Sequence, residues 1–361
     1  MKHLSILTAI ILAASALMAS FQNCYACTGI TLKAKDGSTV VARTIEWAAS
    51  DNDCRWVVVP RGHSWKSFIP GGGTGRSFTN VYGYVGVSVV QDELMMEGMN
   101  EKGLSAGLFY FPDYGRYEEY SEANYETNIS DFQLVSYILG RCATVDEVKA
   151  EIARVHIHGF DPRSSTVHWR FAEPSGRQIV LEIIDGKCVF YENHLGVLTN
   201  SPSFDWQLTN LNNYVNLLPG RTEPHTIGNM SLSSFGGGSA MIGLPGDFTP
   251  PSRFVRAAFF QNTAPQKPDA EGSVFTAFHI LGSMEIPIGA QFPVDETPAD
   301  IPSATQCTCV TDMSGLKFYY RSMYDGGIRC IDLKEIDFKK IGLKSEPLVP
   351  SKKEFVHHIR F

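Results

Sequence analysis

Cys27 follows directly after a short apolar leader, so a single cut would make it the first residue of the chain. Residues 1–26 begin with a positive charge, continue with an apolar stretch from Leu4 to Met18, and end in small residues at Ala26. This three-part pattern is typical of a secretory signal peptide, and its apolar core is too short to span a bilayer. Cleavage after Ala26 would leave a free α-amine, with a reference pKa of roughly 8, beside a thiol with a reference pKa of roughly 8.5. One residue would then supply both a nucleophile and a proton acceptor.

Cys27 has two other interpretations. It could be a lipid-attachment cysteine, but Cys24-Tyr25-Ala26 lacks the branched apolar residue expected three positions before such a site. It could also be a disulfide partner, because export permits disulfides. The mature chain would hold six further cysteines, whose spacing leaves buried free thiols or one bridge near Cys330 as the interpretations: Cys54, Cys142, Cys188, Cys307, Cys309 and Cys330. Cys307-x-Cys309 has no second pair, so we expect no metal site, and no cofactor is implied.

Composition restricts the possible partners. Removing 26 of the 361 residues leaves 335 and takes away one lysine, so the net charge becomes −8 instead of −7. A mildly acidic chain without a basic run is not expected to bind nucleic acid. No second apolar stretch reaches membrane-spanning length, so we expect no membrane association after leader removal. Without an internal repeat or a linker, residues 27–361 are expected to form a single domain.

The elements that position Cys27 begin with a hairpin. Residues 28–34 and 39–46 are rich in apolar and β-branched residues, and Asp36-Gly37 between them is a turn signal. If Asp36 and Gly37 form a two-residue loop, Cys27 lies opposite Glu46. Arg43 would then face the other side of the sheet, and only a bulge or a strong twist would bring it to the thiol.

The remainder of the chain reads as blocks of strands and helices. Strands are predicted at 76–90, 103–111, 166–171, 178–184, 188–192, 316–321 and 328–332, and helices at 130–154 with a break near Gly140, at 252–262 and at 274–282. Because strands and helices do not alternate one by one, the pattern predicts an α+β fold with largely antiparallel sheets.

Four polar residues could complete a reactive site. Arg43 could favour the thiolate form of Cys27 through its charge. The alternative is that Arg43 and Glu46 form a solvated pair at a strand end, but their proximity to Cys27 favours the functional interpretation. Asn200 lies before Pro202 and could donate to an oxyanion, or it could be part of an ordinary turn. If Ser252 is an N-cap, Arg253 lies in the first helical turn, where a cation opposes the helix dipole. This placement indicates that Arg253 has another partner, such as a carboxylate or the active site.

An aromatic-rich segment follows the strand predicted at 103–111. Its six aromatic residues could pack in the core or line a pocket for a bulky apolar acyl group: Phe109, Tyr110, Phe111, Tyr114, Tyr117 and Tyr120.

An ordered series of motifs over the whole mature chain resembles the choloylglycine hydrolase family, which includes penicillin V acylases and conjugated bile acid hydrolases. The matching stretches are CTG at 27–29, ARTIEW at 42–47, GMNEKGL at 98–104, LTNSP at 198–202, FDWQL at 204–208, NLNNY at 210–214, GLPGD at 243–247, SRFVR at 252–256, YYR at 319–321 and IRCIDL at 328–333. The resemblance is greatest to the exported Gram-negative branch. It implies the four-layer αββα sandwich of N-terminal nucleophile hydrolases, with two largely antiparallel sheets between helix layers.

The resemblance also implies roles for individual residues. Cys27 would attack a linear amide while its own α-amine relays the proton, and a covalent acyl-enzyme would then be hydrolysed. Arg43 would support the thiolate, Glu46 would hold the α-amine, and Asn200 would donate to the oxyanion. Arg253 would complete the charged cluster. The backbone N–H of Phe109 would be the second oxyanion donor, with Phe109 and Tyr110 beside the substrate.

Two positions depart from the family pattern: residue 46 is commonly Asp, and many bile acid hydrolases have Asn where this chain has Phe109.

The expected function is therefore hydrolysis of the linear amide of an N-acyl compound by an exported, self-activated cysteine enzyme. Candidate acyl groups are phenoxyacetyl as in penicillin V, the fatty chain of an acyl-homoserine lactone, or the steroid of a conjugated bile acid. The resemblance implies a homotetramer, and the leader implies a periplasmic or secreted location. Two alternatives remain open: a secreted binding protein of the same fold without turnover, and an N-acyltransferase.

Overall fold

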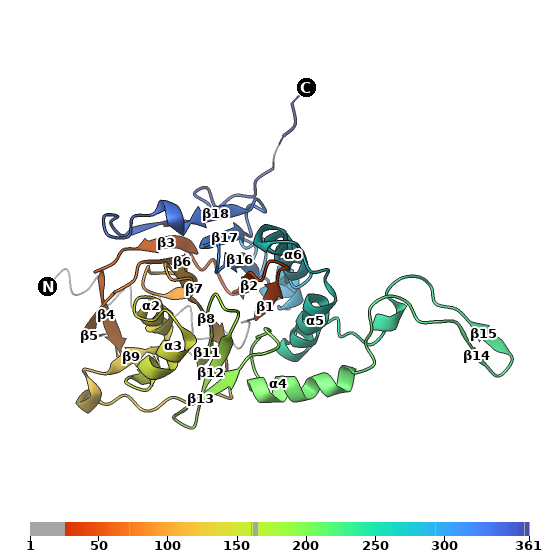
Figure 1. Cartoon of the computed structure of the whole chain (residues 1–361), viewed down its shortest axis with the longest axis horizontal. Helices are drawn as coiled ribbons and strands as arrows, with labels where there is room; N and C mark the ends of the chain where they lie inside the picture. The colour runs from red at the N-terminus through yellow and green to blue at the C-terminus, as the bar shows by residue number, and fades with distance from the viewer. Residues whose placement is uncertain are drawn as a thin grey trace.

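The computed structural model describes residues 26–71, 73–159, 161, 165–292, 294–356 and 358–360. The predicted leader, apart from Ala26, lies outside these residues. Figure 1 shows the chain as a compact body with one long projection. No helix in the described part of the chain has the length and apolar character needed to cross a membrane.

The N-terminal hairpin forms as predicted, but its register differs by one residue. β1 (Cys27–Lys33) pairs antiparallel with β2 (Thr39–Glu46), and Cys27 lies opposite Ile45 instead of Glu46. The loop contains three residues, 35–37, because Ala34 N–H bonds to Ser38 O at 2.9 Å and Gly37 adopts a φ of +91°. A three-residue loop that ends in a left-handed glycine is a common hairpin turn.

This register reverses the two expected faces. Arg43 pairs with Gly29, and side chains alternate along a strand, so Cys27 and Arg43 share one face of the sheet. Glu46 lies on the other face. The predicted register was wrong, and with the correct one no bulge is needed to bring Arg43 to the thiol.

The first sheet has five strands in the order β1-β2-β16-β17-β18. β17 (Lys317–Ser322) and β18 (Arg329–Asp332) confirm the predicted C-terminal hairpin. The sequence reasoning missed β16 (Thr305–Asp312), which joins this hairpin to β2 at the centre of the sheet. All eight residues of β16 are buried, so it shows no alternation between polar and apolar faces.

The second sheet has eight strands in the order β13-β12-β11-β8-β7-β6-β3-β19. The strands span Arg55–Val59 (β3), Tyr84–Ser88 (β6), Met95–Asn100 (β7), Ser105–Tyr110 (β8), Val167–Ala172 (β11), Gln178–Ile184 (β12), Lys187–Glu192 (β13) and Lys344–Pro347 (β19). Every pairing within the two large sheets is antiparallel, as predicted. Smaller sheets pair β4 (Ser64–Ile69) with β5 (Gly73–Thr79) and β9 (Asn128–Ser130) with β10 (His156–His158).

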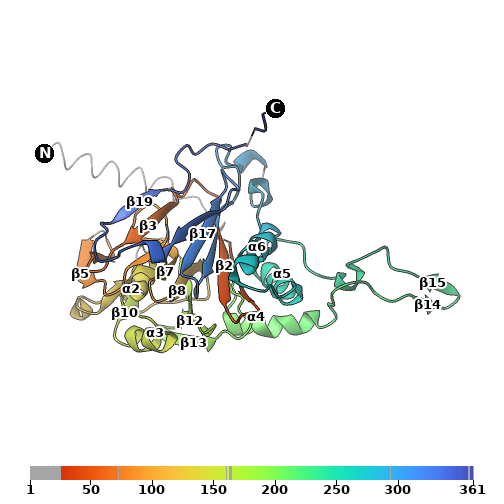
Figure 2. The same ribbon diagram turned by 45° about the horizontal axis from the view of Figure 1, so that its top comes forward.

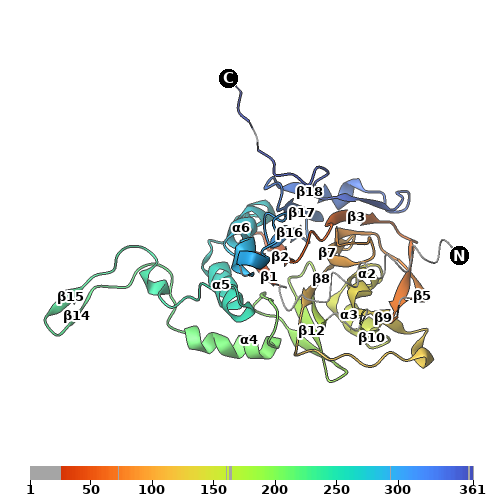
Figure 3. The same cartoon turned by 180° about the vertical axis from the view of Figure 1, so that it is seen from behind.

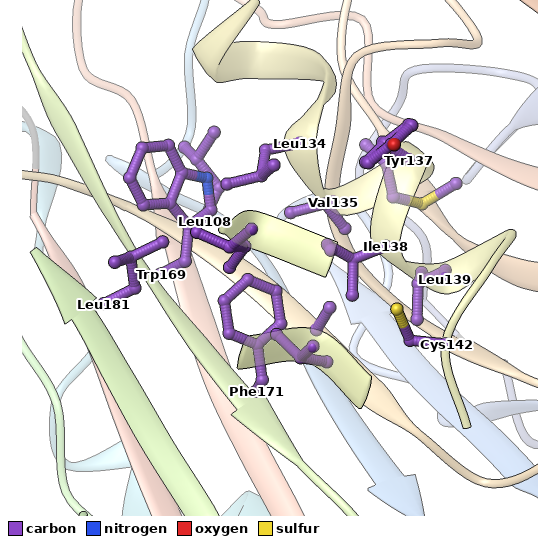
Figure 4. Close-up of a cluster of buried hydrophobic side chains, with 14 of the residues drawn as sticks. Leu108, Leu134, Val135, Tyr137, Ile138, Leu139, Cys142, Trp169, Phe171 and Leu181 are labelled. Atoms are coloured by element: carbon purple, nitrogen blue, oxygen red, sulfur yellow. The ribbon is translucent and has the colours of Figure 1, made fainter. Parts of the chain in front are cut away.

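Helices cover the outer face of each sheet. α2 (Leu134–Leu139) and α3 (Val145–Ile152) confirm the predicted interrupted helix and pack on the second sheet through the cluster drawn in Figure 4. α5 (Pro250–Thr263) and α6 (Ala270–Gly282) pack on the first sheet, on its far side from α2 and α3 (Figure 2). A third apolar cluster fills the space between the sheets. The α+β class and the four-layer αββα sandwich are thereby confirmed.

The start of α5 differs from the prediction. Thr249 is the N-cap and prolines occupy the first two helical positions, where their missing N–H groups cost nothing. Ser252 is therefore inside the helix, and its hydroxyl donates to Asp247 Oδ2 at 2.6 Å.

A long connecting segment joins α4 (Phe204–Asn210) to α5. Residues 215–246, here called the arm, carry the short hairpin of β14 (His225–Ile227) and β15 (Met230–Leu232) at their end. All views show this hairpin projecting away from the body (Figures 1 to 3).

Candidate active site

The thiol of Cys27 lies against a guanidinium. Arg43 Nη2 is 2.7 Å from Cys27 Sγ, and both residues are almost completely buried. The shared face of β1 and β2 produces this contact, because Cys27 opens β1 while Arg43 lies opposite the next inward-facing residue, Gly29.

The rest of the Arg43 guanidinium is held by the second sheet. Nη1 donates to the carbonyls of Met96, at 3.0 Å, and Leu108. Its planar group also lies over the Phe109 ring, with the guanidinium carbon 4.1 Å from the ring centre. Arg43 therefore spans the gap between the two sheets, with one nitrogen left to contact the sulfur.

A buried carboxylate balances this charge. Glu97 Oε2 lies 3.9 Å from Arg43 Nη1, and Glu97 Oε1 accepts from Arg170 Nη2 at 2.7 Å. These charged side chains are nearly inaccessible to water, so each needs the others to offset the cost of desolvation. The sequence reasoning missed Glu97 and Arg170. A single charge inside an otherwise apolar strand is the signal that could have indicated them.

A single antiparallel β-bridge to β1, the edge strand of the first sheet, brings Asn200 into the site. Gly29 and Leu198 exchange both backbone hydrogen bonds, at 2.6 and 3.1 Å, which aligns residue 200 with residue 27. Asn200 Oδ1 accepts from the Cys27 N–H at 2.8 Å, and its Nδ2 donates to Tyr110 O at 2.7 Å.

Arg253 closes the site from the helical side. Its Nη1 donates to Cys27 O at 2.5 Å and to Thr28 Oγ1 at 2.8 Å, while Nη2 donates to Asn200 Oδ1 at 2.7 Å. The expectation that this arginine has a partner outside its own helix is therefore correct. Its main partners are a carbonyl, a hydroxyl and an amide, with no carboxylate in hydrogen-bond contact. Burial lowers the pKa of Arg253, although Glu46 and Cys27 counteract this.

Glu46 is also buried, but it does not hydrogen-bond to the Cys27 nitrogen. Its Oε1 accepts from Thr305 Oγ1 at 3.2 Å, and Oε2 has no protein partner. Burial raises the pKa of Glu46 to about 7, against the opposing effects of Arg253 and nearby hydroxyls. The Cys27 nitrogen is a peptide nitrogen in this uncleaved chain, and it donates to the Asn200 amide oxygen instead.

The two aromatic candidates, Phe109 and Tyr110, make different contacts in the structure. The backbone N–H that bonds to the Cys27 sulfur belongs to Tyr110, the last residue of β8. Phe109 is fully buried, and its ring contributes to the support of Arg43. In the rest of the aromatic segment, Phe111 is fully buried in the core and Tyr114 is about half exposed.

Burial has the largest effect on the ionisation of the Cys27 thiol. It raises the pKa of the Cys27 thiol above its ordinary value; Arg43, Arg253 and the Tyr110 N–H lower the pKa, and Glu46 raises it further. The charge of Arg43 thus acts in the expected direction but does not outweigh desolvation while residue 26 is attached.

The structure brings Cys27, Arg43, Asn200, Arg253 and Tyr110 into direct contact, with Glu46 nearby on the opposite face. The seven described cysteines are all free thiols, so the structure contains no bridge at Cys330. Among the described residues, no group of three or more potential ligands is placed to hold a metal ion.

Known proteins share this sequence and this arrangement of elements. The family model for linear amide C–N hydrolases of the choloylglycine hydrolase family matches residues 27–346. A bile salt hydrolase/transferase of Clostridium perfringens is 32% identical over 316 residues, covering 86% of this chain and 93% of that protein. A penicillin V acylase of Pectobacterium atrosepticum is 28% identical over 332 residues, covering 84% of this chain and 79% of that protein.

Solved structures of related proteins also share the fold. A crystal structure of a mutant conjugated bile acid hydrolase from Clostridium perfringens superposes with a TM-score of 0.79 at 29% identity, covering 92% of this chain and all of that one. The match to the hydrolase family also favours an enzyme over the binding-protein alternative. The chain belongs to the choloylglycine hydrolase family and is a hydrolase of linear carbon–nitrogen bonds in N-acyl compounds.

Proposed function

We propose that Cys27 is the nucleophile of this hydrolase and acts as an N-terminal residue, after the bond between Ala26 and Cys27 is cut. The observation that carries this proposal is the 2.7 Å contact between Arg43 Nη2 and Cys27 Sγ inside a closed polar cluster. A cation this close stabilises the thiolate relative to the thiol, and the thiolate is the reactive form.

The reaction proceeds in two balanced steps. The new α-amine of Cys27 takes the thiol proton, the sulfur attacks the amide carbonyl carbon, and the carbon–nitrogen bond breaks as the departing amine receives that proton. Water then adds to the thioester, gives its proton to the α-amine and releases the carboxylic acid with the thiol restored. Asn200 Oδ1, 2.8 Å from the same nitrogen, orients the amine lone pair toward the sulfur.

Two donors are available for the oxyanion that forms in each step. The Tyr110 N–H already points at the sulfur, and the Nδ2 group of Asn200 has a second hydrogen beyond the one given to Tyr110 O. Arg253 fixes the opposite end of the Asn200 amide. Donors held in this way require no reorganisation when charge develops, which is the main source of their effect on rate.

The leader supports export. We infer that residues 1–26 are a signal peptide whose removal after Ala26 activates Cys27 and delivers the enzyme to the periplasm or the medium. The start of the family match at residue 27 supports this boundary.

The acyl group is inferred to be bulky and apolar. The similarity to a bile salt hydrolase/transferase and to a penicillin V acylase supports steroid and phenoxyacetyl amides as first candidates. The similarity to a hydrolase/transferase also supports a second activity, transfer of the acyl group to an amine in place of water.

The arm supports self-association into the homotetramer. It exposes six large apolar side chains over 32 residues that contain one arginine and one glutamate: Val215, Leu218, Ile227, Met230, Phe235 and Ile242. An apolar, nearly uncharged projection is typical of a surface that packs against another copy.

Hydrolysis assays on Cys27 variants test the nucleophile. We expect Cys27→Ala to abolish hydrolysis of penicillin V, glycine-conjugated bile acid and acyl-homoserine lactone, and Cys27→Ser to retain a small fraction at most. Cys142→Ala, which changes another buried thiol, is the matched control and should retain full activity. Full activity of Cys27→Ala, or a mature chain that starts elsewhere than residue 27 by N-terminal sequencing, would contradict the proposal.

A further inference from the structure

Two buried ionisable residues lie behind the site without touching Cys27. His168 on β11 and Glu182 on β12 are both completely inaccessible to solvent. His168 Nδ1 is 3.1 Å from Glu182 Oε1, and His168 Nε2 is 3.1 Å from the backbone oxygen of Thr199. The mechanism proposed above does not use this pair.

The partners of the imidazole fix one of its hydrogens. Thr199 O is a carbonyl and can only accept, so Nε2 carries a hydrogen. Glu182 Oε1 accepts from the Phe204 N–H at 2.9 Å and is hydrogen-bonded to His168 Nδ1. Both ring nitrogens of His168 therefore have a partner.

The pair holds both ends of one turn. His168 bonds to Thr199 at the start, and Glu182 bonds to Phe204 at the end. Asn200, which contacts the Cys27 nitrogen, Arg253 and Tyr110 O, lies between these two anchors.

The same imidazole also contacts the segment that carries the second donor. Its ring stacks on Phe111 with centres 4.5 Å apart at 8°, and it meets Phe109 edge-on at 6.1 Å. Tyr110, whose N–H bonds to the sulfur, lies between these two rings in sequence. Both donor-bearing segments therefore pack against one buried, hydrogen-bonded pair.

We propose that His168 and Glu182 are positioning residues for hydrolysis: this buried, hydrogen-bonded pair clamps the 199–204 turn and so sets the location of the Asn200 amide. This inference rests on the proposed role of Asn200. The pair acts through Asn200 and touches neither the substrate nor the sulfur.

A double-mutant cycle tests the clamp, with kcat and KM for penicillin V, or for the best amide of the panel above, as readouts. His168→Phe keeps a planar aromatic ring and removes both hydrogen bonds, and we expect kcat to fall on the order of 10- to 100-fold with little change in KM. Glu182→Gln keeps an acceptor for Phe204 and should restore most of the rate relative to Glu182→Leu. In an Asn200→Ala background, His168→Phe should cost no further rate, because the residue it positions is gone.

Tyr137→Phe is the matched control, since it removes another buried hydrogen bond to a carboxylate, the 2.5 Å bond to Glu151 in the helix layer. It should leave kcat unchanged. An equal cost of His168→Phe in both backgrounds, or no cost in the parent, would overturn the inference; where His168→Phe does not fold, the contrast between the two Glu182 variants decides it. If Asn200→Ala itself has no effect, the proposed role of Asn200 fails instead, whereas the Cys27 variants test the proposed function separately.

Discussion

Cys27 combines two opposing requirements, burial and ionisation. Desolvation raises the pKa of its thiol, and a guanidinium at 2.7 Å lowers it. Arg43 can be fully buried at this position because Glu97 and Arg170 extend the charge network and Phe109 lies under the guanidinium. Substitution of Glu97 or Arg170 would therefore affect the Cys27 thiol through Arg43, although neither residue contacts the thiol.

Glu46 makes the stability of the uncleaved chain dependent on pH. Its pKa is about 7 in the fold and about 4.5 in the unfolded chain, so the folded state keeps its proton longer as pH rises. The stability associated with this group is complete below pH 4.5 and is lost as pH rises to 7. This loss amounts to about 3 kcal/mol at most.

We expect Glu46→Gln, which cannot ionise, to lack this loss. Between pH 4.5 and 7.5, the free energy of unfolding of the variant should increase relative to that of the parent by up to about 3 kcal/mol. Urea unfolding at the two pH values measures this difference. The exposed Glu126 provides the control, and Glu126→Gln should follow the parent at both values. Parallel pH profiles for parent and Glu46→Gln would show that burial does not perturb this carboxyl.

At the scale of elements, local patterns predicted which segments form strands and helices but not how they align. Asp36-Gly37 correctly marked a hairpin, yet the same letters fit loops of two or three residues, and one residue of register exchanges the faces of Arg43 and Glu46. β16 was missed because burial on both faces removes the alternation that identifies a strand. Asn200, Arg253 and Cys27 were found from motifs, whereas their contacts depend on long-range pairings such as Gly29 with Leu198.

The loop that sets this register depends on Gly37. With φ at +91° and no atom within 4 Å of a built Cβ, a side chain there meets backbone strain but no clash. We expect Gly37→Val to destabilise the fold by about 1–2 kcal/mol and Gly37→Asn by clearly less, because Asn tolerates left-handed backbone. Urea unfolding compares the parent with the two variants. Equal stability of Gly37→Val and the parent would refute a role for the left-handed turn.

At the scale of the whole molecule, the body buries its apolar side chains whereas the arm exposes them. The body buries four apolar clusters, and the three largest lie between the sheets and under each pair of helices. The arm instead leaves large apolar residues in water, with Phe235 completely exposed. Such exposure is costly for an isolated chain, so the arm is expected to be buried where copies meet.

We therefore expect the protein to behave as a tetramer at micromolar concentration, and Ile227→Ser combined with Phe235→Ser to shift it to smaller species. Light scattering coupled to size-exclusion chromatography measures the mass directly. Val81→Ser, which changes a valine of 58% exposure on the body, is the control and should leave the mass unchanged. The double variant should keep its fold, because the arm hairpin projects away from the clusters that hold the body together (Figure 3). A parent protein that is already monomeric would rule out the arm as a contact between copies.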